Sequence, residues 1–253
     1  MSTSPQPVPI PRRKEWFEVV EGATPSILRV VTQDGYGTGF FLVKSNNGLL
    51  TGVATAYHVI ARAFEWGFPI RLEHATSKRT LTLFPNNRYI EYDIDRDTAV
   101  IVFNTADLPL GEGEPQLLAE KESIKVGCDV GWLGYPAISP NDLCFFSGHI
   151  SNWNPDKHTY LVDGVAINGV SGGPVLRNRP NGEVHLVGII SAYISNNMTG
   201  KSTPGLSVIR DVSSFFPTLK KLKSLPLQQD NPPPPTTVPP VEPKAEVADK
   251  KEP

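Results

Sequence analysis

The sequence predicts an all-β fold in which two antiparallel barrels pack against each other. Apolar stretches of strand length recur along the chain between turn residues, and we expect helix only at His58 to Trp66 and at Asp211 to Ser224. The segment from Asn104 to Glu122 is rich in proline, glycine and acidic residues, and it forms a natural joint near the middle of the strand-rich region. Many short strands, little helix and a central joint are together typical of paired barrels.

Composition narrows the classes of function. The 253 residues are 39% hydrophobic and 20% charged with a formal net charge of -2, whereas a nucleic-acid-binding domain is usually strongly basic. No stretch approaches the roughly 18 apolar residues of a membrane span, and the N-terminus lacks the apolar core of a signal peptide. We therefore expect a soluble, cytoplasmic protein without nucleic-acid or membrane partners.

Two cysteines, Cys128 and Cys144, are too few for a disulfide framework and lack the spacing of a zinc site. They fall on segments expected to be neighbouring strands, so the two thiols can come into contact. A disulfide bridge between them is not expected, because the cytoplasm is reducing. We expect no metal and no cofactor.

Both ends of the chain are predicted to lie outside the folded domain, which spans 25–224. Residues 1–24 begin with a proline-rich stretch and are predicted to form a flexible arm. Residues 225–253 contain N-P-P-P-P-T-T-V-P-P-V-E-P and are predicted to form a disordered, polyproline-like tail that a regulatory protein can bind. Before the tail, Asp211 caps a predicted terminal helix at 211–224, with apolar residues at 212, 215, 216, 219 and 222.

The strands are predicted in two groups, about 25–110 for the first barrel and about 120–210 for the second. Alternating glycines in G-Y-G-T-G-F-F-L-V open into another β-rich run rather than a helix, which argues against a dinucleotide-binding loop. A hairpin of the Asn-Gly type follows at Ser45 to Gly48. The predicted strands are Ser26 to Val31, Gly35 to Val43, Leu49 to Ala54, Ile70 to Glu73, Arg79 to Phe84, Tyr89 to Phe103, Lys125 to Leu133, Leu143 to Ile150, His158 to Val165, Val184 to Ile194 and Leu206 to Ile209.

The segment from Asn168 to Val175 reads N-G-V-S-G-G-P-V and offers a candidate nucleophile, Ser171. A serine hydroxyl needs a base to take its proton and donors to hold the oxyanion that forms on the substrate. The flanking glycines free the backbone, so the amides of Gly169 and Ser171 can point at one spot. The alternative is that this glycine-rich string is only a tight connection between strands.

A histidine and a carboxylate stand at the edges of predicted strands. His58, in T-A-Y-H-V-I, lies just past a strand and begins a short helical stretch that ends at Trp66. Asp97 directly precedes the apolar run Thr98 to Phe103, where a partly buried carboxylate can accept a hydrogen bond from an imidazole. A packed core or surface histidine is the alternative for His58.

Asp97 is the last of three alternating aspartates, and we interpret Asp93 and Asp95 as the solvated end of a strand. The D-x-D-x-D spacing also suggests a calcium loop. Such a loop requires glycine and glutamate where this chain has Thr98 and Asn104, so we reject calcium.

With His58, Asp97 and Ser171 in this order, the chain resembles the trypsin-like (chymotrypsin-fold) serine proteases, especially the compact bacterial, HtrA-type protease domains. The resemblance covers about Pro25 to Lys223. It rests on segments that follow the family's order: G-T-G-F-F-L-V, T-A-Y-H-V-I, D-T-A-V-I-V-F, V-G-C-D-V-G-W-L-G-Y-P, N-G-V-S-G-G-P-V, L-V-G-I-I-S-A-Y and T-P-G-L-S-V-I.

This resemblance implies two six-stranded barrels and a serine endopeptidase that acts on protein or peptide. Ser171 would attack a peptide carbonyl, His58 would carry the proton to the leaving amine, and Asp97 would orient His58. The amides of Gly169 and Ser171 would hold the oxyanion. Ser191, in G-I-I-S, would lie along the substrate backbone.

Two residues depart from the trypsin pattern. Val170 replaces the aspartate that pairs with a newly cleaved N-terminus in trypsin, so we predict no activation by N-terminal trimming. Tyr193 replaces a glycine of deep pockets, and the base of the pocket falls near Val165 or Asp163. We therefore predict a shallow, apolar pocket for a small aliphatic residue before the cut, whereas a preference for Arg or Lys would point to Asp163.

Two other functions stay open. In the first, the domain is catalytically silent or gated by a partner and serves as a module that binds peptides or proteins. In the second, the same three residues hydrolyse an ester or process one dedicated protein.

Overall fold

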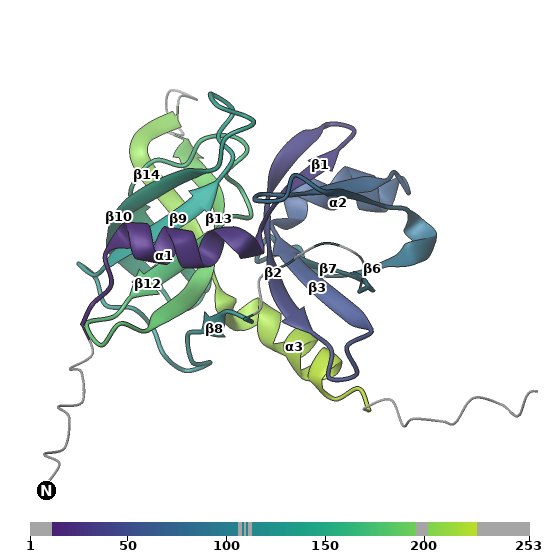
Figure 1. Cartoon of the computed structure of the whole chain (residues 1–253). Coiled ribbons are helices and arrows are strands. Elements are labelled where there is room, and N and C mark those ends of the chain that lie inside the picture. The colour runs from purple at the N-terminus through teal and green to yellow at the C-terminus, as the bar shows by residue number, and fades with distance from the viewer. Residues whose placement is uncertain (1–11, 106–107, 109, 111–112, 196–201, 227–253) are drawn as a thin grey trace, which may run out of the picture.

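The structure is a computed structural model that describes residues 12–105, 108, 110, 113–195 and 202–226 (Figure 1). Two sheets lie side by side with a few short helices, so the predicted all-β fold of two barrels is confirmed. None of the helices within these ranges is long and apolar enough to cross a membrane. The predicted arm before residue 12 and the tail after residue 226 lie outside the described residues.

The first sheet has the strand order β5-β4-β1-β2-β3-β7-β6, and all of its pairs are antiparallel. Its strands are β1 (Ile27–Thr32), β2 (Gly35–Lys44), β3 (Leu50–Thr55), β4 (Ile70–His74), β5 (Thr80–Leu83), β6 (Arg88–Asp93) and β7 (Thr98–Asn104). The sheet has seven strands where six were expected. Among the described residues its edge strands β5 and β6 do not pair with each other, so it forms a half-barrel.

The seventh strand arises because the predicted run from Tyr89 to Phe103 divides into β6 and β7. The chain turns between them, where the Asp93 carboxylate accepts a hydrogen bond from the Arg96 amide at 3.0 Å. Asp97 ends the turn with a left-handed φ of 50°, and its amide donates to the carbonyl of Ile94 at 3.1 Å. Short acidic side chains favour such turns because they bond to nearby backbone, and they override the β character of the flanking residues.

The second sheet has the order β12-β9-β10-β11-β14-β13-β8, and an additional β12–β13 pairing closes six antiparallel strands into a barrel. Its strands are β8 (Gln116–Leu117), β9 (Asp129–Gly134), β10 (Cys144–Asn154), β11 (Thr159–Asp163), β12 (Pro174–Asn178), β13 (Val184–Ser195) and β14 (Ser202–Asp211). The short strand β8 pairs in parallel with β13, inside the segment expected to be only a joint. Two residues are too few to leave a periodic signal in the sequence.

The two cysteines lie on neighbouring strands, as predicted, but far from each other. Cys128 directly precedes β9, whereas Cys144 pairs with Gly134 at the other end of that strand. Six strand residues at about 3.3 Å each separate them by roughly 20 Å. Both thiols are free, and this separation excludes a bridge.

The remaining described elements are helical: α1 (Trp16–Ala23), η1 (Thr24–Ser26), α2 (Tyr57–Glu65), η2 (Pro85–Asn87), η3 (Val212–Phe215) and α3 (Phe216–Lys223). The prediction of a flexible arm over residues 1–24 is wrong for α1, which lies across the second barrel (Figure 1). Apolar residues at 16, 19, 20 and 23 have helical spacing, and the prediction overlooked this pattern. Val19 is buried, and the Trp16 ring lies 5.3 Å from that of Phe145.

The terminal helix occurs where it was predicted. The Asp211 carboxylate accepts a hydrogen bond from the Ser213 amide at 3.0 Å, which caps η3, and η3 continues into α3. α3 leaves the second barrel and lies along the first sheet, where Leu222 is buried (Figure 1). Together, η3 and α3 therefore link the two barrels.

Candidate active site

His58 and Asp97 form a tightly bonded pair in the first barrel. His58 is the second residue of α2, directly after the extended residue Ala56 and Tyr57. Its ring Nδ1 lies 2.8 Å from Asp97 Oδ2, and its own amide donates to Asp97 Oδ1 at 2.9 Å. The Tyr57 amide also donates to the Asp97 carbonyl at 3.2 Å. These three contacts fix the turn before β7 against the start of α2.

Asp97 is ionised at neutral pH. Burial raises the pKa of its carboxyl, but hydrogen bonds and charge from His58, together with the Ser191 hydroxyl, outweigh burial and bring the pKa below its ordinary value. An ionised carboxylate only accepts hydrogen bonds, so the proton of the His58–Asp97 bond resides on Nδ1. The opposite ring nitrogen, Nε2, is then free to accept a proton.

The nucleophile segment is shaped by glycines. Gly169 and Gly172 adopt φ values of 92° and 84°, which disfavour any residue with a side chain. A Cβ on Gly169 would also clash with the Tyr135 carbonyl oxygen, and one on Gly172 with the Thr38 carbonyl oxygen. Both positions therefore require glycine, a stricter demand on the sequence than an ordinary turn between strands makes.

Ser191 connects the nucleophile to the carboxylate. Its hydroxyl donates to Asp97 Oδ2 at 2.6 Å, and its carbonyl accepts from the Ser171 hydroxyl at 3.3 Å. Within the described residues, no hydrogen bond joins Ser171 Oγ to the His58 ring. The 3.3 Å bond is long for a hydroxyl donor, so little opposes rotation of the Ser171 side chain away from it.

Two backbone amides beside Ser171 are oriented by their neighbours. The Asn168 carbonyl accepts from the Ala137 amide at 2.7 Å, and the Val170 carbonyl accepts from the Gly173 amide at 2.9 Å. In a trans peptide the next amide hydrogen points the opposite way, so these two bonds aim the N–H groups of Gly169 and Ser171 away from those partners. Neither amide donates to an acceptor within the described residues.

The residues predicted to bind substrate all belong to the second barrel. Val165 follows β11 and is 49% exposed. Ser191 is buried, with its side chain on Asp97, while Tyr193 lies on β13 with its backbone opposite Ser207. The Tyr193 side chain is outside the described part of the structure. The substrate-binding roles of all three residues stay predictions.

Sequence reasoning missed the hydroxyl contact of Ser191 and the role of Thr38. A buried serine inside the apolar run L-V-G-I-I-S needs a polar partner, which was the available signal for Ser191. Thr38 is fully buried, and its hydroxyl donates to the Gly169 carbonyl at 2.8 Å. Its only signal was a threonine between glycines in G-Y-G-T-G-F.

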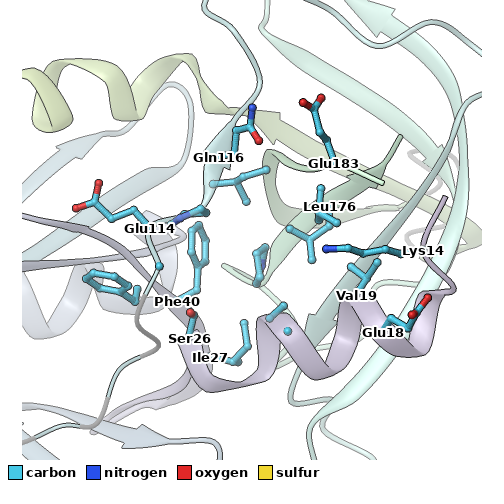
Figure 2. A pocket seen from close by; sticks show the side chains of 18 of the residues that line it. Lys14, Glu18, Val19, Ser26, Ile27, Phe40, Glu114, Gln116, Leu176 and Glu183 are labelled. Atoms are coloured by element: carbon cyan, nitrogen blue, oxygen red, sulfur yellow. The ribbon is translucent and has the colours of Figure 1, made fainter. Parts of the chain in front are cut away.

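A separate cavity of about 430 Å³ lies between α1, β2, β8, β12 and β13 and contains none of the candidate catalytic residues (Figure 2). Its wall is largely apolar and includes Phe40. Glu18 and Glu114 border it, but Glu18 pairs with Arg12 at 2.7 Å and Glu114 pairs with Lys223 at 2.6 Å. The third carboxylate of its lining, Glu183, lies 3.5 Å from His185, and the cavity follows the seam between α1 and the barrels.

His58 is bonded to Asp97, and Ser191 connects Asp97 to Ser171 where the two barrels meet. A histidine, a carboxylate and a serine gathered between two barrels are typical of the trypsin-like hydrolase class. The trypsin-like peptidase domain family matches residues 37–189, which is more than half of the chain. The protein belongs to this family and is a serine protease.

Solved structures share the fold. The serine endoprotease from Yersinia pestis is 19% identical with a TM-score of 0.59, and the match covers 85% of this chain and 68% of that chain. An inactive mutant form of Rv3671c from M. tuberculosis H37Rv is 20% identical with a TM-score of 0.54, and the match covers 85% of this chain and 96% of that chain. Deg5 is 21% identical with a TM-score of 0.53, covering 70% and 83%. At these identities the likeness concerns the fold alone. No curated protein matches the chain.

Proposed function

We propose that this serine protease is an endopeptidase in which Ser171, His58 and Asp97 act as the catalytic triad. The observation that carries the proposal is a series of hydrogen bonds that links His58 to Ser171, with the hydroxyl and the backbone carbonyl of Ser191 as its two points of contact in the second barrel. It runs through the carboxylate of the first barrel and the buried Ser191 of the second, with bonds of 2.8, 2.6 and 3.3 Å. This path brings together groups that are 113 positions apart in the chain, from residue 58 to residue 171.

In the proposed reaction, the Ser171 hydroxyl turns from the Ser191 carbonyl toward His58 Nε2, which takes its proton as Oγ bonds to the peptide carbonyl carbon. Asp97 keeps the other ring proton on Nδ1 and stabilises the imidazolium that forms. His58 then gives its proton to the leaving amine, and the peptide C–N bond breaks to leave an acyl-enzyme. Water, activated by the same base, attacks the ester and releases the second product.

The amides of Gly169 and Ser171 are the proposed oxyanion donors. The bonds from the Ala137 and Gly173 amides to the preceding carbonyls support this role, because they free both N–H groups before substrate arrives. A preorganised donor of this kind is typically worth about 3 to 4 kcal/mol in the transition state.

We further propose a shallow pocket that prefers a small aliphatic residue before the cut. The fully buried Trp132 supports this, because its indole lies directly against Gly164, the residue before the proposed pocket base Val165. Asp163, the other candidate base, accepts a hydrogen bond from the His149 amide and is 3.6 Å from the His149 ring. The Trp132 indole limits the depth of the pocket, and the Asp163 carboxylate is already engaged by His149. Both features disfavour a long cationic side chain of the substrate.

The test is to treat the wild type and Ser171→Ala with a fluorophosphonate probe, and then with a peptide library read by mass spectrometry. We expect labelling and cleavage in the wild type and neither in the variant. Ser77→Ala is the control, because the Ser77 hydroxyl lies 2.9 Å from a histidine nitrogen, His74 Nδ1, outside the proposed triad. Labelling that persists in Ser171→Ala contradicts the assigned nucleophile.

The second candidate function is a domain that binds peptides without cutting until a partner engages it. The bond from the Ser171 hydroxyl to the Ser191 carbonyl favours it, because in that position the hydroxyl is not paired with its base. A wild type that neither labels nor cleaves, and that starts to do so when a partner is added, would support this function. Residues 225–253 remain the proposed site for such a partner.

A further inference from the structure

The Ser191 hydroxyl lies between a carboxylate and a guanidinium. It donates to Asp97 Oδ2 at 2.6 Å, and it accepts from Nε of Arg210 at 3.4 Å. Arg210 lies on β14, which pairs with β13, and it stands opposite Ile189 two residues before Ser191. The guanidinium is thus placed behind the proposed triad, on the side of the second barrel.

A serine hydroxyl has one proton, so the direction of that proton depends on its neighbours. The Arg210 Nε–H can only donate, and it therefore occupies a lone pair of the Ser191 oxygen. The hydroxyl proton is then left for Asp97, which only accepts.

This contact matters because the proposed triad is divided between the two barrels. His58 on α2 and Asp97 in the turn before β7 belong to the first barrel, whereas Ser171 belongs to the second. The bond from Ser191 to Asp97 crosses that division. A second cross-connection lies nearby, where Arg96 of the first barrel donates to the Ser213 hydroxyl at 3.1 Å.

We propose that Arg210 is a positioning residue for the triad: its Nε–H, in a long contact of 3.4 Å, orients the Ser191 hydroxyl toward Asp97, and this hydroxyl supports Asp97 and, through it, His58. The inference rests on the proposed function of Ser171, His58 and Asp97. Arg210 acts through Ser191, and within the described residues it makes no hydrogen bond or ion pair with Ser171, His58 or Asp97.

The test compares two substitutions that separate hydrogen bond from charge. Arg210→Gln keeps an N–H donor at the position of Nε without the charge, and Arg210→Met keeps a similar length without any donor. We expect kcat to fall about tenfold in the Met variant with KM little changed, and to recover to within about twofold of wild type in the Gln variant. Arg177→Met is the control, since Arg177 lies on β12 beside Glu122, 3.9 Å away.

A second readout does not depend on activity. The proton between His58 Nδ1 and Asp97 gives a far-downfield NMR signal when it is held in a stable bond. We expect this signal to weaken by faster exchange with water in the Met variant and to persist in the Gln and control variants, with the thermal unfolding midpoint recorded for each.

The outcomes separate the two claims. If the wild type is active and the Met variant keeps its kcat and its NMR signal, the inference about Arg210 is refuted and the proposed function stands. The same conclusion follows if kcat falls equally in the Met and Gln variants. If the wild type shows no Ser171-dependent labelling, the proposed function fails, and the NMR comparison still decides whether Arg210 holds the His58–Asp97 pair.

Discussion

Thr38 of the first barrel holds Gly169 of the second in the conformation that the nucleophile segment requires. The Thr38 hydroxyl donates to the Gly169 carbonyl at 2.8 Å and accepts from the Tyr135 amide at 3.1 Å, while its own amide donates to the Ser171 carbonyl at 2.8 Å. One fully buried side chain therefore joins the two barrels beside both proposed oxyanion donors. The seam between the barrels is part of the site.

Replacement of Thr38 by valine should impair the nucleophile segment more than the fold. Thr38→Val keeps the shape of the side chain but leaves the Gly169 carbonyl and the Tyr135 amide without their partner. Such buried polar groups cost about 1 to 3 kcal/mol when they are left unpaired. We expect a lower unfolding midpoint together with a fall in kcat. Thr51→Val, which removes a 3.1 Å hydroxyl contact with Thr105, should lower the midpoint without the fall in kcat.

Asp97→Asn should lower activity by a factor on the order of 10⁴, because an amide donates to His58 Nδ1 and forces the proton onto Nε2. It should also change how stability depends on pH. The folded-state pKa of Asp97 lies below its ordinary value, so the ionised carboxylate stabilises the fold above about pH 4 and loses this effect as the pH falls through the lowered pKa. Urea unfolding at pH 7 and pH 3 measures this difference.

The stability gap between wild type and Asp97→Asn should accordingly shrink as the pH decreases to 3 and below. Asp95→Asn alters the same turn and serves as the control, with wild-type activity expected. A gap that stays constant over this range would contradict the carboxylate contacts described here.

Local patterns predicted much of this site. The segments T-A-Y-H-V-I and N-G-V-S-G-G-P-V predicted a histidine at a strand edge, His58, and a serine flanked by glycines, Ser171. His58 and Ser171 both lie where the two barrels meet. The contacts of Ser191, Thr38 and Arg210 join segments that are distant in the chain, and no local pattern reports which distant groups will meet. α1 was overlooked for a different reason. Its apolar spacing spans only two turns, and its stability comes from packing on the second barrel.

Gly169→Ala should disable the protein as a catalyst. The substitution forces a side chain into a left-handed conformation, which costs about 1 to 2 kcal/mol, and it drives Cβ into the Tyr135 carbonyl. Because the segment must shift, we expect at least a hundredfold loss of kcat, as for removal of one oxyanion donor. Gly22→Ala is the matched control: it lies in α1 with no atom near its added Cβ, so it should leave kcat unchanged and raise the unfolding midpoint slightly. Equal kcat in both variants would contradict the assignment.

Trp132→Phe should broaden the preference at the residue before the cut. The smaller ring opens space behind Gly164, so the ratio of kcat/KM for leucine over alanine at that residue should rise several-fold, in line with the roughly 1 to 3 kcal/mol that one methylene group is worth in an apolar pocket. Phe146→Leu is the control, because its ring packs on Trp132 at a centroid distance of 6.2 Å and its loss also loosens the core. If both variants change the preference equally, the effect arises from general loosening of the barrel.

N-terminal trimming should not activate the protein, but it should reveal α1 as part of the fold. Val170, which stands where trypsin has its activating aspartate, is fully buried among apolar side chains, so it offers no charge for a new N-terminus. Removal of residues 1–11 should leave kcat/KM unchanged. Removal through Ala23 exposes the surface that Trp16 and Val19 cover, and it should lower the unfolding midpoint by several degrees. Measurement of midpoint and kcat/KM for both truncations decides the matter, and a gain of activity in either one would contradict the prediction.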